Sequence, residues 1–162
     1  MQMSLHTDYA LRVLMMLGAS RSQATIDDIA LRYGISRNHL AKVVQALQAE
    51  GLVETLRGRG GGLRLAREPE DINIGSVVRR LERFEGFVTC MSGAGGGTGA
   101  ECTIDGACRL KPALAGALEA FLSHLDRFTL AEFINSQRQS LLERLAIDGD
   151  QAKPINKPAS SA

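Results

Sequence analysis

The sequence lacks tryptophan, and aromatic residues make up only 4% of its 162 residues. Its longest unbroken apolar run, Val13 to Leu17, is far shorter than the roughly 18 apolar residues that a membrane-spanning helix needs. The N-terminal segment lacks a basic lead and a small-residue cleavage site, so no signal peptide is expected. We therefore expect a soluble, cytoplasmic protein.

Motifs for catalysis and for nucleotide binding are also missing. No Ser/His/Asp arrangement and no paired carboxylates stand out in the sequence. The glycine-rich stretch 58–63 lacks the third glycine of the dinucleotide fingerprint, and the stretch 93–100 is not followed by the Lys-Ser/Thr of a phosphate-binding loop. The chain is therefore not expected to be an enzyme.

The composition is that of a folded protein, with 44% hydrophobic and 23% charged residues. The net charge of +1 conceals an asymmetry. Residues 1–67 hold nine basic against five acidic residues, whereas the remainder holds ten against thirteen. A basic N-terminal part and an acidic C-terminal part indicate two functions, although two ordinary solvated surfaces would have the same composition.

Apolar spacing predicts two helices at the start of the chain. The first covers residues 5–17 and is closed by Gly18. Thr25 and Asp28 resemble a capping box, which opens a short second helix that Gly34 ends.

A third helix and a hairpin are expected directly afterwards. Ser36 is a good N-cap for the helix, which stops at Gly51. Short strands over 52–56 and 63–65 flank a loop rich in arginine and glycine, and glycine supplies the positive φ that a hairpin turn needs. We therefore expect a winged helix-turn-helix.

The second half of the chain contains a further helix over 72–85, seven glycines within 86–106, and a long helix that begins near Pro112. A capping box at Thr129 restarts the chain as C-terminal helices. The long helix carries an apolar stripe of Leu114, Leu118, Phe121, Leu122 and Leu125. We expect this stripe to pack against a second copy of the chain in a homodimer; the alternative is packing onto the winged domain of the same chain.

The expected fold class is mainly α with a small β-hairpin wing, as a winged helix-turn-helix plus a long dimerisation helix. The expected parts are a DNA-binding domain over 1–85, a glycine-rich cysteine loop over 86–111, the dimerisation helix and C-terminal helices over 112–147, and a disordered tail over 148–162.

Residues at the start of the third helix and on the wing are candidates for DNA contact. The N-terminal residues of a recognition helix reach base edges, so Arg37 could bond a guanine and Asn38 an adenine, while Ser36 could hold a phosphate. The wing arginines suit the minor groove or flanking phosphates. The full predicted DNA-binding set is Ser36, Arg37, Asn38, His39, Lys42, Arg57, Arg59 and Arg64.

All three cysteines, Cys90, Cys102 and Cys108, fall in the glycine-rich segment, which favours a shared ligand role over a disulfide framework. Their wide spacing suits an iron–sulfur cluster better than the paired knuckles of a structural zinc site, although zinc or free thiols remain alternatives. A cubane cluster needs a fourth ligand. The candidates are Asp8, His6, Asp105, His124 or a group of a partner chain.

Several stretches together resemble the iron–sulfur winged-helix repressors that include NsrR, IscR and RirA. They are LHTDYALRVLM, YGISRNHLAKVVQAL, RGRGGGLRL, GACRLKPAL and FLSHLDRFTLAEF, and the resemblance runs from residue 1 to about 145. IscR-like members carry a histidine ligand where this chain has Lys111, and RirA-like members tend to carry asparagine where it has Asp8. The resemblance is therefore strongest to the NsrR branch.

This resemblance implies a homodimer that binds one [4Fe–4S] cluster per subunit. Cys90, Cys102 and Cys108 would supply three ligands, and Asp8 would supply the fourth from the partner subunit. The implied function is repression of nitric-oxide detoxification genes at a palindromic promoter site, relieved when nitric oxide nitrosylates the cluster.

The chain departs from this family at the first two cysteines, which are separated by eleven residues instead of about five; the longer loop adds under about 1 kcal/mol of closure entropy. Two other functions remain open at this stage. One is an iron- or redox-responsive regulator with a [2Fe–2S] cluster, and the other is an iron–sulfur carrier or electron-transfer protein without DNA binding.

Overall fold

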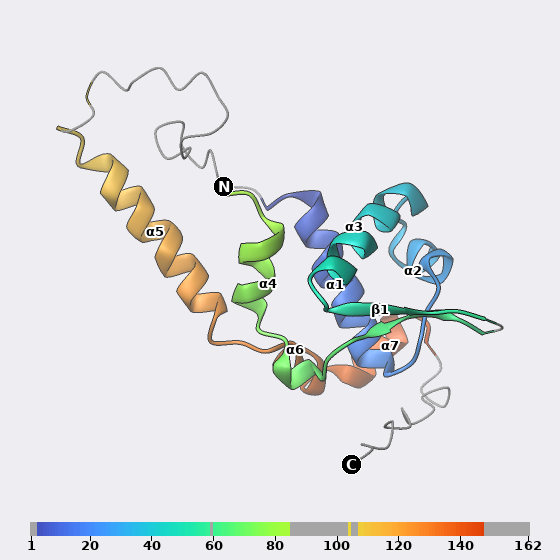
Figure 1. Cartoon of the computed structure of the whole chain (residues 1–162). Helices are drawn as coiled ribbons and strands as arrows, with labels where there is room; N and C mark the ends of the chain where they lie inside the picture. The colour runs from blue at the N-terminus through green and yellow to red at the C-terminus, as the bar shows by residue number, and fades with distance from the viewer. Residues whose placement is uncertain (1–2, 59, 85–103, 105–106, 148–162) are drawn as a thin grey trace, which may run out of the picture.

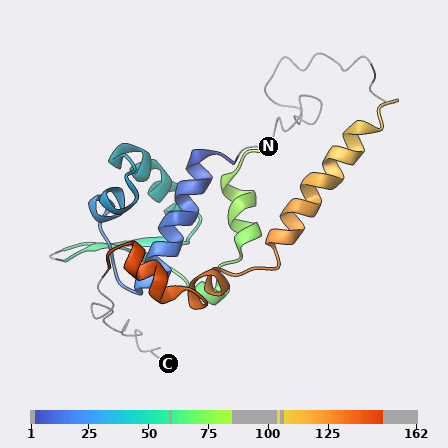
Figure 2. The same ribbon diagram turned by 180° about the vertical axis from the view of Figure 1, so that it is seen from behind.

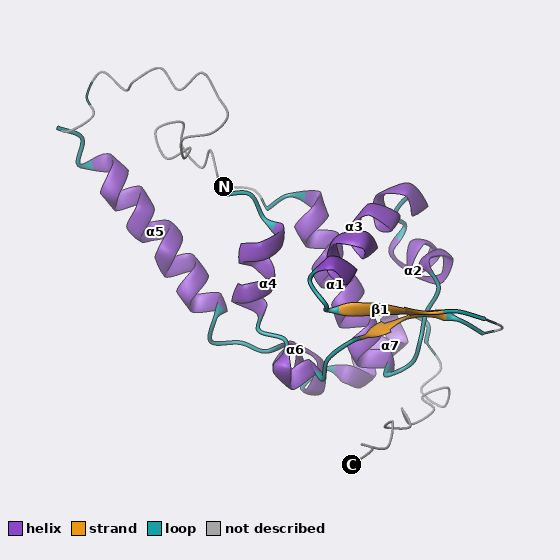
Figure 3. Ribbon diagram, in the orientation of Figure 1, coloured by secondary structure: helices purple, strands orange, loops and turns teal. Residues whose placement is uncertain are grey.

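The computed structural model describes residues 3–58, 60–84, 104 and 107–147. Helices predominate in these ranges (Figure 3), which confirms the expected class of a mainly α fold with a small β-hairpin wing. In chain order, the elements are α1 (Leu5–Ser20), α2 (Ile26–Tyr33), α3 (Arg37–Ala49), β1 (Val53–Leu56), β2 (Gly62–Leu65), the 3-10 helix η1 (Pro69–Asp71), α4 (Ile74–Leu81), α5 (Leu110–Leu125), α6 (Leu130–Asn135) and α7 (Arg138–Arg144).

The elements form a body with an arm and a wing (Figure 1). α1 runs through the middle of the body, α3 packs against it, and α2 packs against α3. The hairpin of β1 and β2 projects from one side of the body, and α5 stands apart on the other side, beyond α4. The reverse view in Figure 2 shows the same separation between α5 and α1.

The hydrophobic core joins the two ends of the chain. α1 contributes Leu14 and Leu17, and α3 contributes Leu40, all of which are almost completely buried. α6 adds Ile134 and α7 adds Leu142 to the same cluster, so both C-terminal helices pack on α1. The helix-turn-helix therefore rests on a scaffold that includes the C-terminal helices.

α1 extends beyond the expected stop at Gly18, and that prediction was wrong. The helix continues to Ser20 and ends where Arg21 adopts a positive φ of 51°. Gly18 is buried inside the helix, where a Cβ would collide with the side chain of Ile134. The glycine is therefore explained by the close approach of α6, which local sequence does not reveal.

The helix-turn-helix begins and turns as predicted. The Thr25 hydroxyl accepts a hydrogen bond from the Asp28 amide at 3.1 Å, and the Asp28 carboxylate accepts one from the Thr25 amide at 2.9 Å. Hydrogen bonds from the Thr25 side chain and amide lower the pKa of Asp28 below its ordinary value. Gly34 then turns the chain with a φ of 63°, and Ser36 caps α3.

The wing is a short antiparallel hairpin, in which Val53 pairs with Leu65 and Leu56 pairs with Gly62. β1 begins one residue later than the predicted strand over 52–56, and β2 begins one residue earlier than the predicted strand over 63–65. Gly58 and Gly60 have positive φ values of 104° and 80°, as expected for glycines in the connecting loop. Two backbone hydrogen bonds between Ala24 and Leu63, of 3.0 and 2.8 Å, fasten the wing to the segment before α2.

α4 is shorter than the predicted helix over 72–85. It starts after Asn73, whose side chain caps the helix by accepting a hydrogen bond from the Ser76 amide at 2.8 Å. It ends at Glu82, whose carboxylate accepts hydrogen bonds from the Ser4 amide and hydroxyl at 3.0 and 2.9 Å. The apolar spacing continues past both ends, but these polar contacts stop the helix.

α5 divides its apolar stripe between two environments. Leu122 is the only fully buried residue of the helix, and Phe121 and Leu125 pack partly against the core. Leu114 is half-buried but does not belong to this core, and Leu110 is 64% exposed. Among the described residues, the core thus covers the C-terminal half of the stripe but not its N-terminal half.

The expected cysteine loop over 86–111 lies mostly outside the described residues, and the expected tail over 148–162 lies wholly outside them. Within the described ranges, no helix combines the length and the apolar character needed to cross a membrane.

Candidate functional site

The start of α3 presents the predicted recognition residues to solvent. Ser36 caps the helix by accepting a hydrogen bond from the His39 amide at 3.3 Å. Arg37, Asn38 and Lys42 are exposed, as is His39. On the opposite side, α3 buries the apolar residues Leu40, Val43, Val44 and Leu47. This division leaves the polar side of the helix free for a groove of duplex DNA.

Arg37 has a partner in the second helix of the motif. Its guanidinium lies 3.2 Å from the carboxylate of Asp27, and the two side chains are 69% and 67% exposed. An ion pair so exposed contributes at most about 1 kcal/mol. The pair can therefore orient Arg37 toward α2 without preventing its transfer to a base or a phosphate.

The wing places its arginines differently. Arg64 pairs with Glu54 across the hairpin at 2.5 Å, which neutralises part of its charge. Arg57 is exposed at the start of the hairpin loop, and among the described residues it forms no ion pair. Arg59 lies outside the described residues. Arg57 is thus the described wing arginine whose charge is most available to a phosphate.

A groove between α3 and the base of the wing adds residues that sequence reasoning missed. Gln45 and Gln48 of α3 line it, together with Thr25 and Thr55. The Gln48 amide donates a hydrogen bond to the Thr55 hydroxyl at 2.5 Å and so bridges helix and wing. Gln45 is exposed one turn beyond Lys42, and that spacing could have identified it as part of the same helix face.

Asp8 lies in the first turn of α1, where its carboxylate pairs with the Arg12 guanidinium at 2.9 Å. That hydrogen bond raises the pKa of Arg12. Arg12 also lies over the Tyr33 ring at 5.9 Å, and the Tyr33 hydroxyl donates a hydrogen bond to the Arg12 carbonyl at 3.0 Å. Burial raises the pKa of Tyr33, which therefore stays a neutral donor. Asp8 is thereby linked to the end of α2.

The neighbouring residue Tyr9 reaches the recognition helix itself. Its ring centroid lies 6.5 Å from that of His39, with an interplanar angle of 32°. Asp8 and Tyr9 are consecutive residues, so a displacement of the first turn of α1 would act on both helices of the motif. The sequence pattern did not predict these contacts, because they join residues 21 to 30 positions apart.

Of the predicted cluster ligands, only Asp8 and Cys108 are among the described residues; Cys90 and Cys102 are not. Cys108 is half-buried directly before α5. The described residues alone contain no group of three or more potential metal ligands. Both views of the chain show the start of α5 separated from α1, with α4 between them (Figures 1 and 2).

The other candidate ligands have different surroundings. His124 lies in the last turn of α5 and forms an edge-on contact with the Phe128 ring at 5.2 Å. A helix of 16 residues spans about 24 Å, so His124 and Cys108 cannot bind one cluster within the same chain. His6 is half-buried on α1, and Asp105 lies outside the described residues.

Comparison of the sequence with known protein families identifies the family of this chain. Residues 3–136 match the Rrf2 family, which is described as an iron-dependent transcriptional regulator. The chain belongs to the Rrf2 family. Its exposed recognition helix, its wing and its supporting α1 are therefore those of a DNA-binding transcription regulator, and it is not an enzyme.

Relatives within the Rrf2 family include proteins named HTH-type transcriptional regulator NsrR. The one from Geobacillus kaustophilus is 46% identical over 149 residues, which are 89% of this chain and 99% of that protein. The one from Bacillus subtilis is 45% identical over 139 residues, or 85% of this chain and 92% of that protein. The resemblance to the NsrR branch expected from the sequence is confirmed.

Solved structures of Rrf2 regulators share the fold. IscR of T. potens superposes with a TM-score of 0.66 at 25% identity, covering 86% of this chain and 90% of that chain. CymR of B. subtilis superposes with a TM-score of 0.60 at 22% identity, covering 84% and 98%. The CymR likeness concerns the fold alone, and both agree with the winged helix-turn-helix architecture.

Proposed function

We propose that the chain acts as a homodimeric repressor of transcription, whose iron–sulfur cluster senses nitric oxide. The observation that carries this proposal is the position of Asp8. The residue that the resemblance assigns as a cluster ligand lies on α1, one contact away from α2 and next to Tyr9, which contacts α3. A ligand exchange at Asp8 therefore has a short physical route to the DNA-binding surface.

DNA binding would use the exposed start of α3 and the wing. Arg37, Asn38 and Lys42 face outward in a position to reach base edges and phosphates of the major groove. Arg57 and Arg64 would contact flanking phosphates or the minor groove. Each phosphate contact releases counterions, so binding is expected to weaken steeply as the salt concentration rises.

The donor set fits an iron–sulfur cluster. Thiolates are the soft ligands that such clusters use, and Cys108 is half-buried beside the start of α5. The Asp8 carboxylate is a harder and more labile ligand, suited to the position that exchanges first. The bound cluster would supply the reactivity toward nitric oxide, and its nitrosylation would relieve repression of nitric-oxide detoxification genes.

The proposed switch exchanges the partner of Asp8. In the cluster-bound dimer, Asp8 would serve the partner subunit, and Arg12 would lose its carboxylate. When Asp8 is released, it can pair with Arg12 as it does in this structure, at 2.9 Å. Arg12 contacts Tyr33, so this exchange changes the forces on the end of α2 and on the turn at Gly34.

The N-terminal half of α5, which the core of the described residues does not cover, supports the homodimer. Leu110 is exposed and Leu114 lies outside the described core, so a second copy of α5 would cover apolar surface that the described residues leave open. Leu114→Glu is expected to convert the dimer to a monomer, as measured by light scattering after size exclusion. Leu31→Glu, at a site 85% exposed on α2, is the control that adds the same charge away from α5.

Native mass spectrometry of protein purified without oxygen would test the cluster. A dimer with four irons and four sulfides per subunit, which reacts stepwise with nitric oxide, would support the proposal. The cluster-loaded protein should also bind a palindromic promoter fragment in a salt-dependent manner. Loss of that binding after nitric oxide is added would support the proposed switch. Loaded protein that binds no promoter fragment, or the same fragment equally after nitric oxide, would overturn it.

Asp8→Asn tests the fourth ligand. The variant is expected to lose its cluster faster than the wild-type protein in the presence of a chelator, as followed by the visible absorption of the cluster. Asp71→Asn, at an exposed carboxylate on η1, is the matched control. Unchanged cluster stability and DNA affinity in Asp8→Asn would remove Asp8 from the mechanism.

The second candidate is a regulator that holds a [2Fe–2S] cluster and responds to iron or redox state. It is kept because eleven residues separate Cys90 from Cys102, whereas about five separate the first two cysteines in the family pattern. A two-iron mass shift that is indifferent to nitric oxide would decide for this candidate. Membership of a transcription-regulator family speaks against a carrier that does not bind DNA.

A further inference from the structure

Within the part of the chain that the structure describes, α5 packs on the hydrophobic core through its C-terminal half. Its C-terminal end contributes the buried Leu122, whereas its first two turns contribute no fully buried residue. Sixteen residues of helix extend about 24 Å, so a rotation of about 10° at the C-terminal end of α5 would move its N-terminal end by about 4 Å. The contacts at the C-terminal end therefore control the position of the whole arm.

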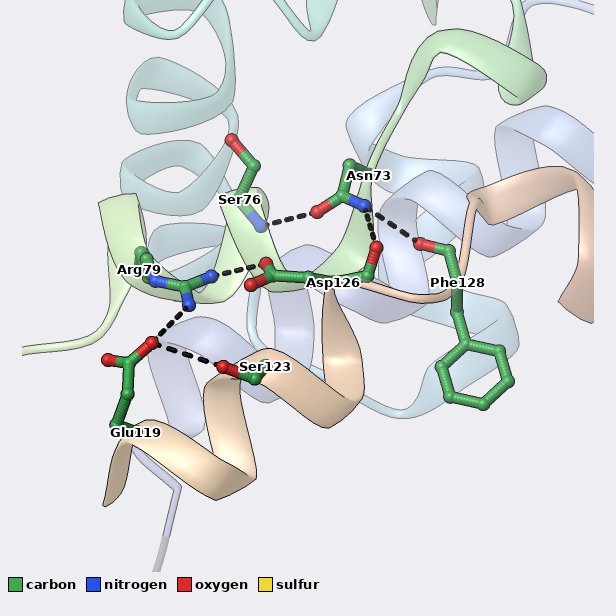
Figure 4. A network of polar contacts seen from close by, with 7 residues as sticks. All are labelled: Asn73, Ser76, Arg79, Glu119, Ser123, Asp126 and Phe128. Carbon is green, nitrogen blue, oxygen red and sulfur yellow. Dashed lines mark hydrogen bonds and ion pairs between the residues drawn. The ribbon is translucent and has the colours of Figure 1, made fainter. Parts of the chain in front are cut away.

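The guanidinium of Arg79, on α4, binds two carboxylates near the C-terminal end of α5 (Figure 4). Its guanidinium donates to the Asp126 carboxylate and lies 3.5 Å from the Glu119 carboxylate. Glu119 also accepts a hydrogen bond from the Ser123 hydroxyl at 3.1 Å, which holds it in place along α5. A planar guanidinium that bridges two carboxylates restrains direction as well as distance.

Asn73 and Gly75, at the start of α4, contact the chain at and just after the C-terminal end of α5. Asn73 caps α4 with its side-chain oxygen, and its side-chain nitrogen donates to the carbonyls of Asp126 and Phe128 at 2.6 and 3.4 Å (Figure 4). At Gly75, a Cβ would lie 2.7 Å from the Asp126 backbone nitrogen. The backbones of the two helices therefore meet at a distance that only glycine permits.

We propose that this α4–α5 joint, formed by Asn73, Gly75, Arg79, Glu119 and Asp126, sets the spacing between the two DNA half-sites that the dimer recognises. The joint fixes the angle between the arm and the winged domain of each chain. In a dimer built on α5, that angle fixes the separation and rotation of the two recognition helices. Arg79 is a positioning residue, since its printed contacts are with Glu119 and Asp126 of the arm.

The geometry of DNA makes this spacing a sharp readout. One added base pair between half-sites shifts the second site by about 3.4 Å and rotates it by about 35°. A rigid dimer must therefore lose one half-site when the spacing changes, whereas a dimer with a loosened joint can follow the change. Affinity for a single half-site does not depend on the angle and should not change.

The test begins with duplexes selected from a random pool by the wild-type protein, followed by a series in which the spacing of the selected half-sites is lengthened or shortened by one or two base pairs. Arg79→Gln is expected to reduce the preference for the selected spacing over its neighbours by at least about threefold, with unchanged half-site affinity. Arg79→Lys keeps the positive charge but cannot bridge both carboxylates in the same way. Its spacing preference should lie between those of the wild-type protein and Arg79→Gln.

Arg80→Gln is the matched control. Arg80 is the next residue of α4, and it pairs with Glu50 of the winged domain at 2.9 Å instead of contacting α5. Dimer mass and helix content, measured alongside, separate a loosened joint from a misfolded chain. The proposal is overturned if Arg79→Gln, folded and dimeric, keeps the wild-type spacing preference, or if Arg80→Gln changes it equally.

This inference rests on the proposed dimeric repressor, and the two fail differently. If the wild-type protein selects no sequence with two half-sites, the proposed function is wrong and the joint has no spacing to set. If the wild-type protein selects one spacing and Arg79→Gln selects the same one with equal preference, only the inference about the joint is wrong.

Discussion

The arginines of the proposed DNA-binding surface differ in the ion pairs that restrain them. Arg37 pairs with Asp27 of the neighbouring helix, and Arg64 pairs with Glu54 of the opposite strand. Arg57, on the wing, has no ion pair among the described residues. A restrained arginine can discriminate between bases, whereas an unrestrained one is better suited to a phosphate at any sequence.

Alanine substitutions should separate these two roles. Arg37→Ala is expected to weaken binding to the preferred sequence by about 1–3 kcal/mol and to relax the preference at one base position. Arg57→Ala should weaken binding to all sequences alike and lower the salt slope by about 1. Fluorescence anisotropy over a salt series measures both, and equal losses on all sequences for Arg37→Ala would contradict its base-reading role.

Glu82 gives a prediction about pH. Burial raises its pKa, but hydrogen bonds from Thr7 and Ser4 outweigh burial and hold the pKa below the ordinary value of 4.5. Because the folded-state pKa is depressed, its stabilisation is fully present above pH 4.5 and is lost as the pH falls through the folded-state value.

Glu82→Gln should therefore lower the free energy of unfolding at pH 7, and the difference from the wild-type protein should shrink as the medium becomes more acidic than pH 4.5. Urea unfolding at several pH values measures it. Glu70→Gln, at an exposed carboxylate of η1, is the control. A difference that stays constant down to pH 2 would exclude the hydrogen-bonded carboxylate as the cause.

At the scale of elements, the junction of α4 with α5 depends on a glycine. Gly75→Ala improves helix propensity by about 1 kcal/mol, but the new Cβ would meet the backbone of Asp126. Overpacking against backbone costs about 1–3 kcal/mol. We therefore expect a net loss of thermal stability, which calorimetry would detect.

Gly116→Ala is the control for Gly75→Ala, because a Cβ at Gly116 of the same arm meets nothing within 4 Å. It should be neutral or stabilising in the monomer. A gain in stability from Gly75→Ala would mean that α4 and α5 can move apart at no cost, and it would weaken the argument for a rigid joint.

Local chemistry explains which elements the sequence predicted well. The capping boxes at Thr25 and Thr129 marked helix starts because both partners of each box lie three residues apart. The expected helix end at Gly18 was wrong because the glycine is required by the close approach of Ile134, which is far away in the sequence. The helix expected over 72–85 was too long because its last contact, from Glu82 to Ser4, joins residues 78 positions apart.

The candidate site follows the same division. The exposed face at the start of α3 was predicted, since it depends on the cap at Ser36 and on apolar spacing within one helix. The pairing of Arg37 with Asp27, the contact of Tyr9 with His39 and the groove beside Gln48 were not, because each depends on how two elements pack. Asp8 was one of several candidates for the fourth ligand, and only the family resemblance singled it out.

At the scale of the whole molecule, the proposed ligand set predicts an asymmetry in mixed dimers. Asp8 lies on α1, and Cys108 precedes α5, a helix that Figure 2 shows on the far side of α4 from α1. If Asp8 serves the partner subunit, a dimer of one Asp8→Asn chain and one Cys108→Ser chain contains one fully intact site and one site with both defects.

Such mixed dimers, purified with a different tag on each chain, should retain one cluster of wild-type stability per dimer. The two homodimers should retain none of that stability, and they are the controls. Iron content and visible absorption after chelator challenge measure the result. If Asp8 instead serves its own chain, each site carries one defect, and no cluster of wild-type stability should remain in the mixed dimer.

The packing of α1 against both C-terminal helices has a consequence for biosynthesis. Arg138 donates a hydrogen bond to the Ala19 carbonyl at the end of α1 at 2.8 Å, and Arg32 of α2 donates to the Leu145 and Ala146 carbonyls beyond α7. α1 and α2 are synthesised first, but the hydrophobic core that they share with α7 is complete only after α7 has been synthesised. A nascent or prematurely terminated chain would carry the recognition helix without its scaffold, so only completed polypeptides should compete for the operator.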